Sequence, residues 1–140
     1  MTLTDAGPLI AIIDADEPDH AACLEALDQV GLPLVTTWPA FTESMYLLGR
    51  AGGIAAQRAL WRLVQTDRLF VADLSRSVVE RSARLMDQYA DRPMDLAVAT
   101  LVAYAEENGH RTIFTLDCDF QIYRLRGRGR FETIPAVRSG

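Results

Sequence analysis

The sequence predicts an α/β fold built on a mainly parallel central sheet. Short apolar runs, typical of buried strands, alternate along the chain with longer segments of helical periodicity. This alternation is typical of strands that are joined by right-handed helical crossovers and therefore lie parallel in one sheet. Strands are expected at residues 3–5, 32–35, 69–72 and 112–114, with a candidate edge strand at 131–134.

The segments between these strands carry helix signals. Proline near the first turn, capping side chains and apolar residues at every third or fourth position mark their starts and inner faces. Residues 94–105 are apolar on nearly all sides, which predicts a helix buried in the core. Helices are expected over residues 9–13, 20–30, 36–48, 54–65, 75–89 and 94–105, with a glycine-rich break at 49–53 and a helical turn at 117–123.

Composition limits the class of function. The 140 residues suit one domain spanning residues 1–140, and the net charge of −5 argues against a protein that coats nucleic acid. All 14 basic residues are arginine, so Schiff-base lysine chemistry and a Walker A loop are excluded. Two cysteines predict neither a disulfide nor a zinc site. Without a membrane-length apolar run or a signal peptide, a cytoplasmic protein is expected.

Acidic residues stand where the predicted sheet would place a ligand site. Asp5 and Asp117 follow the first and fourth strands, and parallel strands present their C-terminal ends at one edge. Glu43 lies in the first turns of the helix after the second strand. Asp95 begins the helix that leads into the fourth strand, and Asp119 adds a fifth carboxylate.

Each of these acids also has a local explanation. Asp5 could cap the helix that follows it, and Asp95 could cap its own helix while pairing with Arg92. Glu43 has no basic residue three or four positions away, so it lies either at the edge of the core or facing a site.

Carboxylates gathered at one point predict a divalent cation. They cannot all stay ionised without one, because their mutual repulsion raises their pKa values. Hard oxygen ligands of this kind suit Mg²⁺ or Mn²⁺. Such ions orient a water, lower its pKa and offset charge on a phosphodiester. The residues therefore predict a metal-dependent phosphoryl-transfer or hydrolase site.

Four short motifs, taken in order, resemble those of PIN domains and in particular of VapC-type toxin ribonucleases. They are Asp5-Ala-Gly-Pro, Thr42-Glu43, Pro93-Met-Asp-Leu-Ala97 and Thr115-Leu-Asp-Cys-Asp-Phe120. Together they extend across almost the whole chain. The resemblance implies a three-layer α/β/α fold with a central sheet of four to five short strands.

The resemblance further implies an endoribonuclease that depends on Mg²⁺, or on Mn²⁺ in its place, and cleaves structured RNA such as tRNA or ribosomal RNA. The catalytic and metal-binding acids that it implies are Asp5, Glu43, Asp95 and Asp117. Asp119 would be auxiliary, and Thr115 would hold the pocket through its hydroxyl. Val98 departs from the pattern, since many relatives have a further Asp there; this concerns an outer ligand only. A VapB-like antitoxin, homodimers and hetero-oligomers with the antitoxin are also implied.

An acidic pocket repels RNA, so arginines at its rim are needed to attract it. The candidates are Arg124, Arg126, Arg128 and Arg130. Guanidinium groups suit phosphate, although a solvated loop or an antitoxin contact explains the same run. The alternative function is a catalytically silent PIN-like module that binds RNA or protein. Receiver domains and haloacid-dehalogenase-type phosphatases are disfavoured because both need a lysine.

Overall fold

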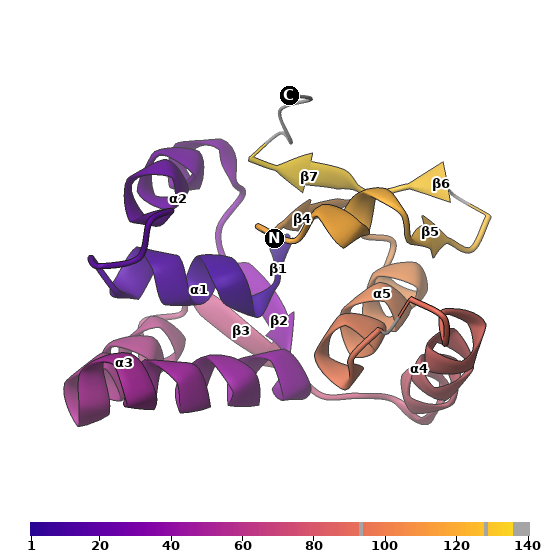
Figure 1. Cartoon of the computed structure of the whole chain (residues 1–140), viewed down its shortest axis with the longest axis horizontal. Helices are drawn as coiled ribbons and strands as arrows, with labels where there is room; N and C mark the ends of the chain where they lie inside the picture. The colour runs from indigo at the N-terminus through magenta and orange to yellow at the C-terminus, as the bar shows by residue number, and fades with distance from the viewer. Residues whose placement is uncertain (93, 128, 136–140) are drawn as a thin grey trace.

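The computed structural model describes residues 1–92, 94–127 and 129–135, and has a five-stranded parallel sheet with helices on both faces (Figure 1). The strands are β1 (Thr2–Thr4), β2 (Leu34–Thr37), β3 (Leu69–Ala72), β4 (Thr112–Phe114) and β7 (Glu132–Ile134). They lie in the order β3-β2-β1-β4-β7, and their neighbouring pairs are parallel. The predicted α/β class with a parallel sheet is confirmed.

The helices form a layer on each side of the sheet, which gives the expected three-layer arrangement (Figure 1). The first layer contains α1 (Ala6–Ile13), α2 (His20–Ala26), η1 (Leu27–Gln29) and most of α3 (Trp38–Gln65). The second contains α4 (Arg76–Gln88) and α5 (Leu96–Asn108). The short turn η2 (Cys118–Gln121) precedes a hairpin of β5 (Arg124–Leu125) and β6 (Gly129–Arg130).

Alternation along the strands divides the apolar residues between two cores. Leu34 of β2 belongs to the core beneath α1–α3, whereas Val35 belongs to the core beneath α4 and α5. In β4, Ile113 and Phe114 divide in the same way. Successive side chains of a strand point to opposite faces, so even these short strands contribute to both cores.

The second strand and the helix after it differ in their bounds from the prediction. β2 begins at Leu34 rather than residue 32 and continues to Thr37, because four of its residues pair in register with β3. The two helices expected at 36–48 and 54–65 are joined as α3. A single non-helical residue, Gly53, interrupts it with φ 63° and ψ −155°. Glycine has no Cβ and adopts this positive φ without strain.

The segment 124–130, expected to be a loop, contains a small antiparallel hairpin in which Arg124 lies opposite Arg130. Leu125, which lies opposite Gly129, is 2% exposed and belongs to the core beneath α4 and α5. This buried leucine fixes the hairpin to the domain. Its burial could not be predicted from the arginine-rich sequence around it. Arg128 lies outside the described residues.

Helix α5 is buried almost throughout, as its apolar composition predicts. Asp95 caps its N-terminus and Gly109, with φ 75°, ends it. Seven consecutive residues from Ala97 to Ala103 are buried. The helix therefore forms the centre of the second core.

Truncation of Leu101 to alanine tests this core. Leu101 is fully buried in α5, so Leu101→Ala should lower the free energy of unfolding by about 2–5 kcal/mol. Leu24→Ala is the matched control, since Leu24 lies on a helix but is 44% exposed, and its effect should stay below about 1 kcal/mol. Urea denaturation of both variants measures the difference. Equal losses would contradict the assigned packing.

Candidate functional site

The C-terminal ends of β1 and β4 form the centre of the candidate site. These neighbouring strands are parallel, and the amide of Asp5 donates to the carbonyl of Phe114 at 2.9 Å. Asp5 and Thr115, the residues that follow the two strands, are therefore held side by side. This is the edge of a parallel sheet at which ligand sites occur.

A chain of hydrogen bonds connects the residues after these strands. The Thr115 hydroxyl donates to Oδ2 of Asp5 at 3.2 Å and accepts from the amide of Asp117 at 3.0 Å. The amide of Asp119 then donates to Oδ1 of Asp117 at 2.9 Å. Thr115 is only 3% exposed, so its hydroxyl links the two aspartates from below the surface.

The carboxylate of Asp5 is buried among other acids. Burial raises its pKa from 3.8 to about 6, although hydrogen bonds from the Ala6 amide and Thr115 hydroxyl oppose that shift. The negative charges of Asp117 and Glu43 raise the pKa further. Asp5 also caps α1, because its Oδ1 accepts from the Ala6 amide at 2.8 Å. The local capping explanation thus holds, together with a place among the acids.

Glu43 and Asp95 extend the group of acids from two different helices. Burial raises the pKa of Glu43, and the negative charge of Asp95 raises it further. Oδ1 of Asp95 caps α5 by accepting from the amide of Val98 at 2.8 Å. The charge of Glu43 acts on Asp5 and that of Asp95 acts on Glu43, and Glu43 and Asp95 line the same groove. Acids far apart in sequence therefore lie near one another at this edge of the sheet.

The pairing of Arg92 differs from the expected one. Its Nη1 lies 3.5 Å from Oδ1 of Asp119, not against Asp95 as sequence proximity suggested. Both side chains are exposed, so the pair contributes little to stability. It does put a guanidinium at the acids, and sequence reasoning had not chosen Arg92 as a candidate RNA contact.

Tyr123 is a second residue at the site that sequence reasoning missed. It is 1% exposed, and burial raises the pKa of its hydroxyl to about 12, with further increases from Asp119, Asp117 and Asp95. Its ring packs edge-on against Tyr89 and Phe120 with centroid separations of 5.1 and 5.6 Å. Only its place at the end of the turn after Asp119 indicated proximity to the acids.

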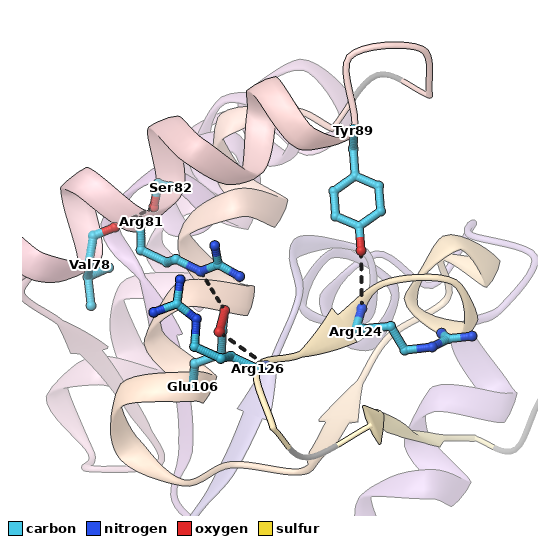
Figure 2. A network of polar contacts seen from close by, with 7 residues as sticks. All are labelled: Val78, Arg81, Ser82, Tyr89, Glu106, Arg124 and Arg126. Atoms are coloured by element: carbon cyan, nitrogen blue, oxygen red, sulfur yellow. Dashed lines mark hydrogen bonds and ion pairs between the residues drawn. The ribbon is translucent and has the colours of Figure 1, made fainter.

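The arginine hairpin is fixed to α4 and α5 by two contacts that Figure 2 shows. The Arg124 amide donates to the Tyr89 hydroxyl at 3.3 Å, and the Arg126 amide donates to Oε2 of Glu106 at 3.2 Å. Oε1 of Glu106 also accepts from Nε of Arg81 at 3.1 Å. Because these side chains of Arg81 and Glu106 are only 19% and 10% exposed, the ion pair forms a partly buried clamp.

The hairpin arginines differ in how they are presented. Nη1 of Arg124 donates to the carbonyls of Gln121 and Ile122 at 3.0 and 2.6 Å, so its guanidinium folds back onto its own chain. Arg126 is held beside Glu106, which is 11 residues beyond Asp95 and therefore about 16 Å away along α5. Arg126 thus lies along the side of α5 rather than directly over the acids.

Comparison with known proteins identifies the family. The PIN domain family model matches residues 2–125. The chain belongs to the PIN domain family. The chain is also 34% identical over 134 residues to the Mycobacterium tuberculosis protein Ribonuclease VapC26, a match that covers 95% of this chain and 99% of VapC26. The resemblance inferred from the four motifs is confirmed.

Solved structures agree on the fold of this PIN domain. VapC20 of Mycobacterium tuberculosis, described as a toxin that cleaves the sarcin–ricin loop, has a TM-score of 0.80 at 17% identity, covering 87% of this chain and 94% of that one. VapBC2 of Rickettsia felis, bound to a DNA fragment from its promoter, has a TM-score of 0.65 at 13% identity, covering 94% of this chain and 97% of that one. At these identities the comparison shows the shared fold alone.

The acids of this PIN domain suit a divalent cation by their chemistry. Divalent-metal dependence is a general trait of PIN-domain VapC nucleases. Carboxylate oxygens are the ligands that Mg²⁺ and Mn²⁺ prefer, and a cation would offset both the burial of charge and the weaker repulsion that raise the pKa of Asp5. Within residues 1–92, 94–127 and 129–135, however, no three acids, histidines or cysteines stand as a ready-made ligand cluster. The acids converge without closing around one point.

In the part of the chain that the structure describes, no helix has both the length and the apolar character needed to span a membrane.

The raised pKa of Asp5 predicts how metal-free stability depends on pH. The folded PIN domain holds the Asp5 proton more tightly than the unfolded chain does, so stability should fall as pH rises from about 4 to about 6. The change from 3.8 to about 6 corresponds to at most about 3 kcal/mol. In the presence of a chelator, Asp5→Asn should remove most of this loss of stability. Urea denaturation at several pH values between 4 and 7 measures the free energy of unfolding. Asp87→Asn, a surface control, should keep this loss; an unchanged slope in Asp5→Asn refutes the prediction.

Proposed function

We propose that this chain is a divalent-metal-dependent endoribonuclease that hydrolyses phosphodiester bonds of structured RNA, such as tRNA or ribosomal RNA. The observation that carries the proposal is the convergence of Asp5, Glu43, Asp95 and Asp117 at one edge of the sheet, with Asp5 buried among like charges. The relation to Ribonuclease VapC26 over nearly the full length of both chains supports the same activity.

The proposed roles follow from where each acid is held. Asp5 is the most rigidly placed, because both of its carboxylate oxygens accept hydrogen bonds and its amide donates to the end of β4. Asp117 is positioned through Thr115, and Glu43 and Asp95 approach from α3 and α5. These four carboxylates would hold Mg²⁺, or Mn²⁺ in its place, with Asp119 auxiliary. When bound, the ion would lower the pKa of a water and offset charge on the phosphodiester.

The biological setting that we propose is a VapBC-type toxin–antitoxin pair in the cytoplasm. The chain would be the toxin, silenced by a VapB-like antitoxin, and would form a homodimer or a hetero-oligomer with that antitoxin. Similarity to VapC26, together with the shared fold of VapBC2 and of a toxin–antitoxin complex from Klebsiella pneumoniae, supports this setting.

A silent PIN-like binding module remains the second candidate. One observation favours it, namely that the described residues contain no ready-made cluster of three metal ligands. The two candidates differ in whether divalent metal binds to the folded chain and whether RNA is cut.

Cleavage of total tRNA in Mg²⁺ tests the catalytic assignment. Asp5→Asn, Glu43→Gln and Asp117→Asn should each lower the cleavage rate by at least about a hundredfold, the scale expected when electrostatic stabilisation of a transition state is lost. Asp28→Asn, on η1 outside the group of acids, should cleave like the parent chain. Gel analysis of time courses measures the rates, and circular dichroism checks folding. Folded site variants that cleave at the parent rate would contradict the catalytic role assigned to these acids.

Metal binding can be measured without RNA. Mg²⁺ or Mn²⁺ that binds only the folded chain raises the melting temperature by mass action, and metal at 100 times its Kd adds about 2.7 kcal/mol. We expect the melting temperature to rise with millimolar Mn²⁺ in the parent chain and in Asp28→Asn, but not in Asp117→Asn. A melting temperature insensitive to both metals would favour the silent binding module.

A further inference from the structure

An apolar groove adjoins the acids where α3 meets the start of α5. It has a volume of about 670 Å³. Trp38 and Tyr46 of α3 line it together with Leu96 at the start of α5. Glu43 and Asp95 form part of the same lining. The groove and the acidic site are therefore continuous, since they share two carboxylates.

The indole of Trp38 is fixed in orientation but remains uncovered. Its Nε1–H donates to Oδ1 of Asp73 at 3.1 Å. The ring packs edge-on against buried Phe41, with centroids 5.6 Å apart and planes at 89°. Even so, Trp38 is 44% exposed. An aromatic ring held in place before binding loses little freedom when a flat ligand stacks on it.

The positively charged side chain of Arg50 lies on α3 beyond the groove. Glu43, Tyr46 and Arg50 are spaced at i, i+3 and i+7, so they share one side of the helix. The guanidinium of Arg50 lies 6.0 Å from the centroid of the Tyr46 ring, which is 61% exposed. Glu43 and Arg50 are about 10 Å apart along the helix axis. A carboxylate, one exposed ring and a cation therefore follow one another along this side of α3, and Trp38 stands one to two turns before the carboxylate.

We propose that this groove binds an unpaired base of the RNA, next to the phosphate at the acids. Trp38 and Tyr46 would stack on the base, and Arg50 would contact the phosphate of a neighbouring nucleotide. This inference rests on the proposed function. Aromatic stacking accepts every base, whereas a paired base inside a duplex has no free face to offer. The groove would therefore direct cleavage to loops and other single-stranded parts of a structured RNA.

The charges of the groove favour a nucleotide over an apolar protein segment. A nucleotide combines a neutral planar base with a phosphate that, together with a divalent cation, suits the acidic end. An apolar helix or a second copy laid on the groove would take Glu43 and Asp95 out of water without neutralising them. Burial of unpaired carboxylates is costly. The groove therefore matches the alternation of base and phosphate.

Binding can be separated from cleavage in a metal-free Asp117→Asn background, where no cleavage occurs and the affinity reports the contacts of the groove and of Arg50. The probe is a short fluorescein-labelled oligoribonucleotide, used single-stranded and as a duplex of the same sequence, with affinity measured by anisotropy. Tyr46→Ala and Trp38→Ala should each weaken single-strand binding about tenfold and leave duplex binding unchanged. Trp38→Phe should retain most of the affinity. Trp61→Ala is the matched control, because Trp61 is a 43% exposed tryptophan of α3 outside this groove.

Tyr46→Ala keeps the test decisive if Trp38→Ala fails to fold, since Tyr46 is mostly exposed. Unchanged single-strand affinity in folded Tyr46→Ala, or an equal loss for duplex, overturns the proposal. Unchanged affinity accompanied by conversion of a dimer to a monomer in light scattering assigns the groove to a second copy instead. If the acid variants cleave normally while Tyr46→Ala weakens single-strand binding, the nuclease assignment fails but the base site stands.

Discussion

The structure depends on one carboxylate that is held out of water where the central strand β1 and its neighbour β4 end. Asp5 is tied through its amide to β4, through one carboxylate oxygen to the start of α1, and through the other to Thr115. These contacts fix its position but do not cancel the cost of its charge, and its pKa rises to about 6. The Thr115 hydroxyl that donates to Asp5 also accepts from the amide of Asp117, and it thereby sets the path of the chain after β4. Local geometry at a single buried group therefore arranges the centre of the site.

Capping and site formation are compatible uses of the same side chains. Asp95 and Asp117 each use Oδ1 to accept a backbone amide at the start of a helical segment. A carboxylate has two oxygens with several lone pairs, so one capping bond leaves acceptor capacity for other partners. Capping also restricts the rotamer, which places the remaining oxygen reproducibly. Helix capping therefore explains how these acids are oriented, and it does not exclude a functional role for them.

Most of the architecture could be predicted because strong local patterns agree with tertiary packing. β3, β4 and α4 lie within a residue of their expected bounds, and buried α5 follows from an apolar run without a polar face. The end of β2 was missed because pairing with β3, a tertiary effect, extends the strand through Thr37. Leu125 and Tyr123 were missed because their burial depends on contacts with distant elements. Neighbours in sequence suggested Arg92 with Asp95, but the turn after β4 brings Asp119 to Arg92.

The acids are divided between the two layers that cover the sheet. Glu43 is carried by α3, which contributes Phe41 and Leu48 to the core of the first layer, whereas Asp95 is carried by α5 at the centre of the other. The distance between the two carboxylates consequently depends on how α3 and α5 pack against the sheet. A buried hydrogen bond of 2.8 Å between the hydroxyls of Thr37 and Thr100 fastens α5 to the end of β2. A substitution that repacks either hydrophobic core, even far from the acids, would therefore move α3 relative to α5 and change the distance between the carboxylates of Glu43 and Asp95.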